Sequence, residues 1–473
     1  MKFINHKKFN WLFLLPFLLI AFSCNPDDDH SAQEIEKNKI VNEWIKENMD
    51  VLYYWNTKMP AGKNMKVFPA DYFESILYKQ EDHFSFIAED FAQLMETLSG
   101  VQLEAGYDFT LFYEDEKMQN LYGLINYIKP NSPASSAGLK RGDKFSTVNG
   151  KQITINNYQT LLNETYAAHT LGVLRNSTIQ SFSLSVVKYE ENPILLDSIY
   201  DYDMYGKKIA YLIYNFFSID KGDDSRNYIK ELNDVFGKYK QANINELILD
   251  LRYNSGGQVV VATALASMIS NRESSDVFCI DQYNSIVDNE YKRIYGDIDY
   301  NKTFFANYLP KVNSGDADIP VNKLGIPRLY VLVSRNTASA SELLINGLKP
   351  YIDVTLIGET TYGKNVGMAL LYEDDPKKQK DNRWGMLPVV CKIFNSENKS
   401  DFSDGFRANI EVDEYKIKPM PPLGNIDEIL LEAALVNIGV KSASPLRSGK
   451  TGFDSKPLKS SIDLTPERKN MFR

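Results

Sequence analysis

A repeated order of strand, helix and strand between residues 195 and 439 is the feature that most constrains the fold. ELILDLR at 246–252 carries a continuous apolar run, which is typical of a strand buried on both faces. NSGG interrupts the run, and QVVVATALASMIS then continues as a helix. RLYVLVS, SELLINGL and VTLIG repeat this order over 328–358. The spacing predicts an α/β core with a mostly parallel sheet and a working edge at the carboxyl ends of the strands.

Three small residues, Ala338, Ser339 and Ala340, stand where one of these strands meets its helix. Small side chains let the backbone turn sharply and leave room for another group to approach. Ser339 is expected at the helix N-terminus, where free N–H groups and the helix dipole favour developing negative charge. A nucleophile would be useful there. The alternative on local sequence is that Ser339 and Ser341 are helix N-cap residues.

A serine nucleophile needs a base, and histidine is the usual one. The α/β region contains none, because the four histidines are His6, His30, His83 and His169, and no G-x-S-x-G sequence is present. The remaining candidate is Lys364, which follows Ser339 by 25 residues in GETTYGKNVG. A lysine base must be neutral and therefore desolvated. One helix, a return strand and a short loop fit this separation, although Lys364 alone could be a solvated loop lysine.

The composition excludes other classes of function. The formal net charge is −9, and no stripe of Lys and Arg is interleaved with aromatic residues, so nucleic acid is not an expected partner. No Cys/His cluster is present, so no metal and no other cofactor is expected. Cys279 and Cys391 could form one disulfide, but their spacing does not require it.

Residues 1–24 are typical of an export signal, because lysines precede the apolar run WLFLLPFLLIAF. That run is too short to span a bilayer. It ends in AFSC, which resembles a bacterial lipobox and predicts a lipid anchor to the membrane on Cys24. The alternative is an ordinary signal peptide with an incidental cysteine.

Residues 25–33 are expected to be an acidic linker. Their sequence NPDDDH resembles the surface-export signal of Bacteroidetes lipoproteins. This predicts a cell-envelope lipoprotein of the outer membrane, exposed at the cell surface; a periplasmic orientation is the alternative.

Two further regions flank the rest of the chain. Residues 34–100 are expected to form a small helical cap domain, because apolar residues recur at steps of three and four, at Ile40, Val41, Trp44, Ile45, Met49 and Leu52. Residues 440–473 are rich in Ser, Lys and Pro and lack periodicity, which predicts a mobile tail.

Residues 101–190 mix short strands with turns, and Phe182, Leu184 and Val186 alternate as in an edge strand. SPASSAGLKRGD followed by VNG resembles a PDZ domain. Such domains add an extended peptide to a sheet edge and often hold its terminal carboxylate on backbone N–H groups. The expected capture loop is Gly106, Tyr107, Asp108 and Phe109. Asp108 stands where a second glycine is usual and would repel a terminal carboxylate, which leaves recognition of C-termini open.

The core resembles the C-terminal processing peptidases, also called tail-specific proteases. SASE contains Ser339, the GE-x-x-x-GK loop contains Lys364, and DLRYNSGG at 250–257 supplies a third motif. The resemblance covers the helical, PDZ-like and core regions in the family's order. It implies a ClpP/crotonase-like α/β peptidase core with an inserted PDZ-like domain and a small N-terminal helical domain.

The resemblance also implies roles for these residues. Ser339 would be the nucleophile and Lys364 the general base that together hydrolyse peptide bonds of protein or peptide substrates. Backbone N–H groups at Gly256, Gly257 and Ala340 would form the oxyanion hole, since glycine allows close approach to the carbonyl oxygen. Thr361 would help to orient the lysine, and Glu342 would support the site.

Two positions depart from the family pattern. Met368 replaces a glutamine that many members use as a third catalytic group, and Pro350 stands where many carry an acidic residue. Met368 and Asp108 favour an alternative, a surface peptide-binding lipoprotein that kept the fold and lost turnover. The retention of Ser339, Lys364 and Thr361 favours the peptidase.

Overall fold

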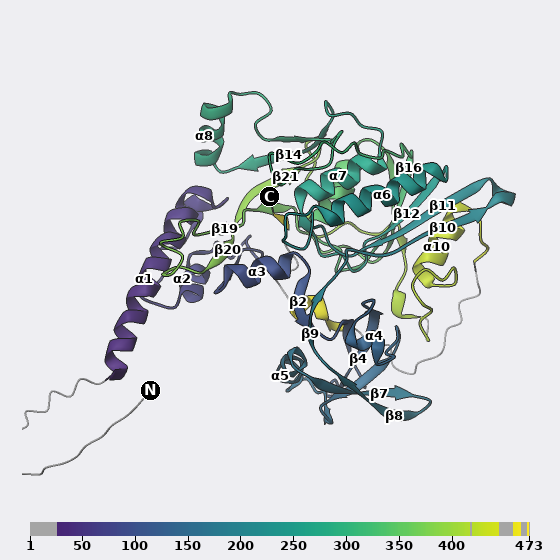
Figure 1. The fold of residues 1–473 in the computed structure, drawn as a ribbon, viewed down its shortest axis with the longest axis horizontal. Helices are drawn as coiled ribbons and strands as arrows, with labels where there is room; N and C mark the ends of the chain where they lie inside the picture. The colour runs from purple at the N-terminus through teal and green to yellow at the C-terminus, as the bar shows by residue number, and fades with distance from the viewer. Residues whose placement is uncertain (1–25, 417–418, 444–456, 465–470, 473) are drawn as a thin grey trace, which may run out of the picture.

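The computed structural model describes residues 26–416, 419–443, 457–464 and 471–472. The predicted leader and its candidate lipidation site Cys24 lie outside these residues. Figure 1 shows three regions: a helical cap with a long first helix, a PDZ-like domain below, and an α/β core above it. No helix in the described ranges is both long and apolar enough to cross a membrane.

The cap is mainly helical, as predicted. One face of its first helix packs against the rest of the cap through Val41, Ile45 and Met49, while Ile40 is exposed. The helix begins at Pro26, so most of the predicted linker 25–33 is helical; proline followed by acidic residues is a typical helix start. The elements are α1 (Pro26–Leu52), η1 (Asn56–Lys58), α2 (Pro69–Ile76), β1 (Phe86–Ala88) and α3 (Phe91–Leu98).

The PDZ-like domain is built on an antiparallel sheet, with β8 at one edge as the alternation at Phe182 and Leu184 predicted. Its core contains Leu111, Ile125 and Phe145. The elements are β2 (Val101–Glu104), β3 (Tyr107–Tyr113), β4 (Leu121–Ile128), α4 (Pro133–Ser136), β5 (Lys144–Val148), β6 (Lys151–Gln152), α5 (Tyr158–Asn163), η2 (Glu164–Tyr166), β7 (His169–Arg175), β8 (Thr178–Leu184) and β9 (Val187–Glu190).

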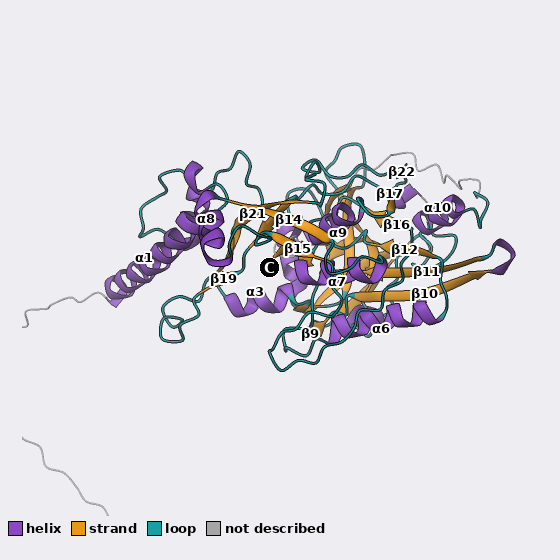
Figure 2. Ribbon diagram, turned by 90° about the horizontal axis from the view of Figure 1, so that it is seen from above, coloured by secondary structure: helices purple, strands orange, loops and turns teal. Residues whose placement is uncertain are grey.

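The main sheet of the core has the order β10-β11-β12-β16-β17-β22. All its pairings are parallel except that of β10 with β11, a long hairpin that projects from the core in Figures 1 and 2. The mostly parallel sheet is therefore confirmed. The strands are β10 (Ile194–Tyr202), β11 (Lys207–Tyr214), β12 (Glu246–Asp250), β16 (Arg328–Val333), β17 (Asp353–Gly358) and β22 (Ile410–Glu411).

Helices cover both faces of this sheet, so its strands are apolar on both sides. Leu247 and Leu249 of β12 pack toward one face with α6, α7 and α9, and Ile248 packs toward the other with α10. The helices are α6 (Asn227–Gln241), α7 (Val259–Ile269), α9 (Ala340–Leu348) and α10 (Ile429–Ile438).

Smaller sheets join the core to the cap. Cys279 and Cys391 lie on the paired strands β14 and β21 as buried thiols that form no disulfide. One sheet has the order β13-β24-β18-β21-β14-β15 and another the order β1-β20-β19. Their elements are β13 (Gly257–Gln258), β14 (Val277–Tyr283), α8 (Ser285–Tyr295), β15 (Lys302–Phe304), β18 (Val366–Met368), β19 (Leu371–Tyr372), β20 (Gly385–Leu387) and β21 (Val389–Phe394), with η3 (Asp203–Tyr205) and η4 (Glu414–Lys416) in loops.

The C-terminal segment differs from the predicted unstructured tail 440–473. It contains β23 (Pro457–Ser460), η5 (Ser461–Leu464) and β24 (Met471–Phe472). β23 pairs with β3 of the PDZ-like domain, and β24 pairs with β13 and β18 of the core. Local periodicity could not predict these strands, because their pairing partners lie hundreds of residues away in the sequence.

Candidate active site at the carboxyl edge of the parallel sheet

The predicted nucleophile Ser339 lies between β16 and α9, at the edge of the sheet that the sequence predicted. Its backbone has φ 62° and ψ −115°, a conformation that L-residues rarely adopt and that often accompanies functional sites. The residue is fully buried. Ser339 is the N-cap residue of α9, as the local alternative predicted, and it forms a capping box with Glu342, whose carboxylate accepts from the Ser339 N–H. Its Oγ makes no hydrogen bond of normal geometry to the described residues, so the hydroxyl remains available for chemistry.

The carboxylate of Glu342 joins the two predicted catalytic residues. Its Oε2 accepts hydrogen bonds from the backbone N–H groups of Ser339 (3.0 Å) and Lys364 (2.8 Å). Its Oε1 accepts from the N–H of Gly363 (2.7 Å) and the hydroxyl of Thr361 (2.6 Å). Burial raises the pKa of Glu342, and these four donors oppose that shift. One buried carboxylate thus fixes the nucleophile loop against the lysine loop.

Lys364 is fully buried. Its Nζ is 3.0 Å from Sδ of Met368 and 5.3 Å from the ring centre of Phe84, which belongs to the cap. Burial lowers the pKa of Lys364 to about 7, although attraction to Asp82 and Glu342 opposes the shift. A thioether is only a weak acceptor, so Met368 does little to favour the charged amine. The lysine is not the solvated loop residue of the alternative interpretation.

The cap supplies much of this desolvation. Val366 and Met368, which follow the lysine on β18, belong to the same hydrophobic cluster as Ile45 and Tyr72 of the cap helices. The cap therefore closes over the lysine loop. The cap thereby contributes to the burial that lowers the pKa of Lys364.

The predicted oxyanion loop needs one correction. Gly257 has φ 133°, and a side chain there would place Cβ 2.1 Å from the carbonyl oxygen of Phe217, so only glycine fits. The N–H of Gly256, however, donates to Oδ1 of Asn254 (2.9 Å) and is not free to bind a carbonyl oxygen. Ala340 is the first residue of α9, where N–H groups lack an acceptor within the helix. The remaining candidate donors are Ala340 and Gly257, which lies on β13 and pairs with β24 in this structure.

Asn254 is a site residue that the sequence analysis missed. Its side chain donates to the carbonyl of Tyr214 (2.8 Å), and its own carbonyl accepts from the hydroxyl of Ser341 (3.1 Å) and the N–H of Ala338 (3.2 Å). It thus holds the oxyanion loop against the nucleophile loop. This assigns Ser341 a cross-loop contact instead of the proposed N-cap role.

Thr361 acts on the loop and not on the lysine amine. Its hydroxyl donates to Glu342 and accepts from the N–H of Phe406 (2.7 Å). These two bonds tie the lysine loop to Glu342 and to the segment that carries Phe406. The orienting role implied for Thr361 is therefore indirect.

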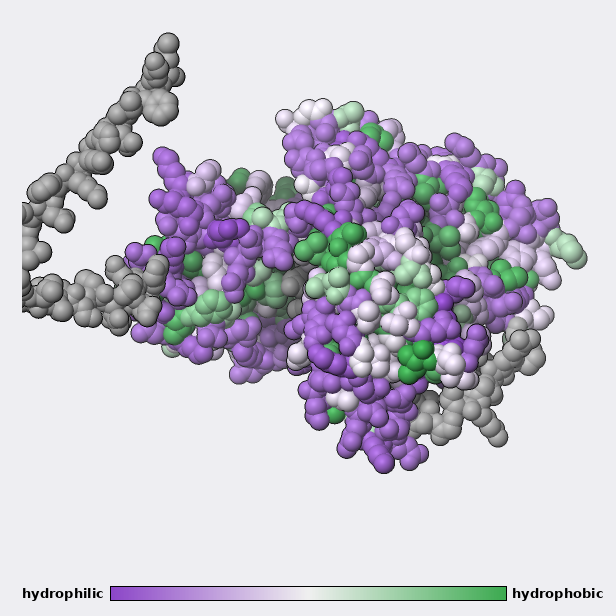
Figure 3. Space-filling view, turned by 60° about the horizontal axis from the view of Figure 1, so that its bottom comes forward, coloured by the Kyte–Doolittle hydropathy of each residue, from purple (hydrophilic) through white to green (hydrophobic). Residues whose placement is uncertain are grey.

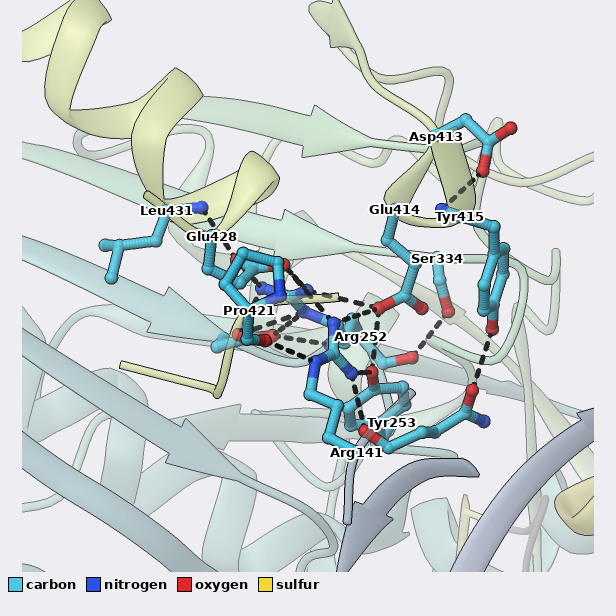
Figure 4. A network of polar contacts seen from close by, with 12 residues as sticks. Arg141, Arg252, Tyr253, Ser334, Asp413, Glu414, Tyr415, Pro421, Glu428 and Leu431 are labelled. Atoms are coloured by element: carbon cyan, nitrogen blue, oxygen red, sulfur yellow. Dashed lines mark hydrogen bonds and ion pairs between the residues drawn. The ribbon is translucent and has the colours of Figure 1, made fainter. Parts of the chain in front are cut away.

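A buried charge network lies behind the oxyanion loop (Figure 4). The guanidinium of Arg252 is 2.8 Å from Asp250, 2.7 Å from Glu428 and 3.2 Å from Glu414. Arg141 of the PDZ-like domain donates to the hydroxyl of Tyr253 (2.6 Å) and reaches Glu414 at 3.1 Å. The network links the PDZ-like domain to the motif DLRYNSGG. The charged residues Asp250 and Arg252 at the end of an apolar strand were the sequence feature that could have indicated it.

The predicted capture loop lines a pocket on the PDZ-like domain, together with Ser461 and Ile462 of the C-terminal segment. Gly106 has φ 85°, and a Cβ there would lie 2.2 Å from Cβ of Ser132. Asp108 is buried, and its Oδ1 accepts from the side-chain amide of Asn126 (2.6 Å). The described residues contain no group of three or more His, Cys, Asp or Glu side chains that could hold a metal.

Three family models match this chain. Residues 41–86 match the peptidase S41 N-terminal domain, residues 124–175 match a PDZ domain, and residues 208–375 match peptidase family S41. These spans correspond to the cap, the PDZ-like domain and the core with its predicted site.

Similar proteins carry processing-protease names. The chain is 27% identical to the carboxy-terminal processing protease CtpA of Bacillus subtilis, over 53% of this chain and 46% of that protein. It is 26% identical to a carboxyl-terminal-processing protease of a Picosynechococcus species, over 55% and 58%. The matched region thus spans about half of each curated relative. A candidate S41 protease from Bacteroides fragilis has a similar solved structure, with TM-score 0.64, 25% identity, and coverage of 84% of this chain and 98% of that one.

Proposed function

Because the chain belongs to peptidase family S41, a family of serine-type peptidases, and carries the family's N-terminal and PDZ domains, we propose that it hydrolyses peptide bonds with Ser339 as nucleophile and Lys364 as general base. The observation that carries this proposal is the buried lysine whose pKa is lowered to about 7, held with Ser339 on the carboxylate of Glu342. A neutral amine at physiological pH can accept a proton from serine.

The reaction proceeds through an acyl-enzyme. The amine of Lys364 takes the proton of the Ser339 hydroxyl as Oγ attacks the peptide carbonyl, and the N–H groups of Gly257 and Ala340 donate to the resulting oxyanion. Lys364 then gives its proton to the leaving amine as the C–N bond breaks. Water attacks the ester by the same route, which releases the second product and restores the serine.

Other residues position these groups. Glu342 and Thr361 hold the lysine loop, and Asn254 holds the glycine turn. The PDZ domain supplies a site for substrate binding or regulation. The family matches give no support to the alternative of an inactive peptide-binding protein.

We also propose that the enzyme works outside the cytoplasm, anchored by lipid on Cys24. The support is the leader sequence with its apolar run and AFSC. Cys24→Ser should move the protein from the membrane fraction to the soluble fraction of cells. Membrane association that survives this substitution would contradict the anchor, and protease shaving of intact cells would decide between surface and periplasm.

The test of the peptidase proposal is cleavage of casein, an unstructured protein, by the chain without its leader. Ser339→Ala and Lys364→Ala should each abolish cleavage, while the control Lys349→Ala, at the end of α9, should keep it. If no protein substrate is cleaved by the parent chain, or if Lys364→Ala remains active, the proposed function is wrong.

A further inference from the structure

The C-terminal segment of the chain occupies an edge of the PDZ sheet. β23 pairs antiparallel with β3, with Pro457 opposite Phe112, Lys459 opposite Leu111 and Ser460 opposite Thr110. Leu458 packs against the core of the domain. An added strand of this kind is how PDZ-type domains bind extended peptides. We call residues 457–463 the tail segment.

The tail segment runs toward the capture loop. Ser461 and Ile462 line the same pocket as the loop residues 106–109. The hydroxyl of Ser461 donates to Asp108 and accepts a long hydrogen bond from the N–H of Phe109 (3.4 Å). The segment thus enters the site in the direction of a bound peptide, but presents a serine hydroxyl where a terminal carboxylate would otherwise lie.

The contact with Ser461 explains why an aspartate can stand at position 108 of the capture loop. An ionised carboxylate is only an acceptor, so it repels another carboxylate and binds a hydroxyl. Asn126 holds Asp108 in place through a 2.6 Å hydrogen bond between buried side chains. The aspartate therefore selects for a hydroxyl donor.

The chain turns sharply after this contact and also touches the core. Asp463 accepts from the backbone N–H of Ser460 (2.7 Å), which closes the turn. The hydroxyl of Ser460 is 3.1 Å from Oδ1 of Asn336, three residues before Ser339. Further along, β24 pairs in parallel with Gly257 and with Met368. The same C-terminal segment therefore contacts the PDZ site, the nucleophile loop and the oxyanion loop.

Figure 3 shows the face of the molecule that carries the PDZ domain, where hydrophobic residues of the described part of the chain lie among hydrophilic ones. Main-chain pairing at β3 and the Asp108 contact are the specific features of this face.

We propose that the β3 edge binds extended internal segments that present a serine hydroxyl to Asp108, and that the tail segment is its resident occupant, which a substrate must displace. The proposed binding site rests on the pairing of β23 with β3 and on the contact between Ser461 and Asp108. Only the expected effect of tail release on the cleavage rate depends on the proposed peptidase function.

The binding test uses the chain without its leader and with Ser339→Ala, so that no peptide is cleaved. The probe is a labelled, C-terminally amidated peptide of residues 456–464, measured by fluorescence anisotropy. In the parent the tethered segment, at millimolar effective concentration, should exclude micromolar probe. Ser461→Asp places a negative charge against Asp108, releases the tail segment, and should tighten binding of the probe at least tenfold.

Three controls make the outcome decisive. Ser442→Asp adds the same charge at an exposed position before the tail segment and should bind the probe as weakly as the parent. Asp108→Ala added to Ser461→Asp should abolish the gain. A probe with alanine in place of Ser461, or one that ends at Ser461 in a free carboxylate, should bind more weakly than the amidated serine probe.

Equal binding by the parent and Ser461→Asp, or tighter binding of the free-carboxylate probe, would overturn the proposal. Hydrogen exchange gives a second measurement that needs no probe peptide. Those backbone amides of residues 109–112 that face β23 should be protected in the parent and lose that protection in Ser461→Asp. With Ser339 intact, Ser461→Asp should cleave casein several-fold faster than the parent, and Ser442→Asp should not.

Discussion

Two basic side chains, Lys364 and Arg252, are both completely buried in the core, yet their surroundings have opposite effects on charge. Burial disfavours the charged form of each. Around Arg252, the carboxylates of Asp250, Glu428 and Glu414 outweigh that effect and hold its pKa above the ordinary value. Around Lys364, desolvation outweighs the attraction of Asp82 and Glu342, and the pKa falls to about 7.

Arg252 is therefore a permanently charged structural residue, whereas Lys364 can gain and lose a proton. Arg252 is fixed as a charge, and in return its field lowers the pKa of Glu428 to about 2 despite the burial of that carboxyl. Lys364 is left able to change its charge near neutral pH, which is the property that a general base needs. Burial alone therefore does not set the charge of a basic side chain: the balance between desolvation and nearby carboxylates does.

The largest expected effect is on activity. Lys364→Met removes the base while keeping an apolar side chain of similar length, so kcat/KM for casein-derived peptides should fall by about 10²- to 10⁴-fold. Steady-state cleavage checks this, with Lys349→Met as the matched control. Activity within tenfold of the parent would show that another group accepts the proton.

The same substitution should raise stability at low pH. The folded lysine holds its proton only below about 7, and the unfolded lysine holds it up to its ordinary value of 10.5. The unfolded state therefore binds more protons between these values, so stability of the parent rises with pH across that window. Below pH 7 the parent bears the full cost of a buried charge. At pH 6, Lys364→Met should have a higher free energy of unfolding than the parent.

Arg252→Met should have the opposite effect. It removes the cation that Asp250, Glu428 and Glu414 share; Arg141 still pairs with Glu414 and Glu428, but Asp250 loses its ion pair. Breaking a buried pair in this way costs about 3–5 kcal/mol. Urea unfolding checks the loss of stability. A variant as stable as the parent would mean that Asp250, Glu428 and Glu414 are solvated or protonated without penalty.

A smaller effect is expected at Thr361. Thr361→Val keeps the side-chain shape and removes the hydroxyl that joins Glu342 to the N–H of Phe406. Because the residue acts through the lysine loop, kcat should fall about tenfold, with KM nearly unchanged and the pH profile shifted. Thr361→Ser should restore most of the activity. A change in KM alone would contradict this positioning role.

The smallest effect is expected at Met368. In Met368→Gln a side-chain amide oxygen replaces the weak thioether acceptor and favours the protonated amine, so the pKa of Lys364 should rise by about one unit. The acid limb of the pH profile should move upward by the same amount. An unmoved limb would show that the side chain at 368 does not face the amine in solution.

Sequence patterns predicted the features that depend on local order. Apolar runs predicted the parallel strands, and Ser339 and Lys364 were placed at one sheet edge because each follows a strand of that sheet. The family resemblance implied that Glu342 supports the site, but not that its carboxylate binds the Ser339 N–H, Thr361 and the lysine loop.

The features that sequence patterns missed depend on contacts between distant segments. The N–H of Gly256 donates to the side chain of Asn254 and is therefore not free for an oxyanion. The pattern N-x-G alone cannot show that this N–H already has an acceptor. Arg252 meets Glu428 from a helix 176 residues later. β23 becomes a strand only because β3 offers an unpaired edge.

The most direct test of the central claim, that Lys364 is neutral near physiological pH, is the pH dependence of covalent modification of Ser339. A fluorophosphonate probe reports serine reactivity without any substrate-binding step. Because the neutral amine is the base, the inactivation rate should rise with pH through a single midpoint near 7. A midpoint near 10, the ordinary range of lysine, would contradict the account.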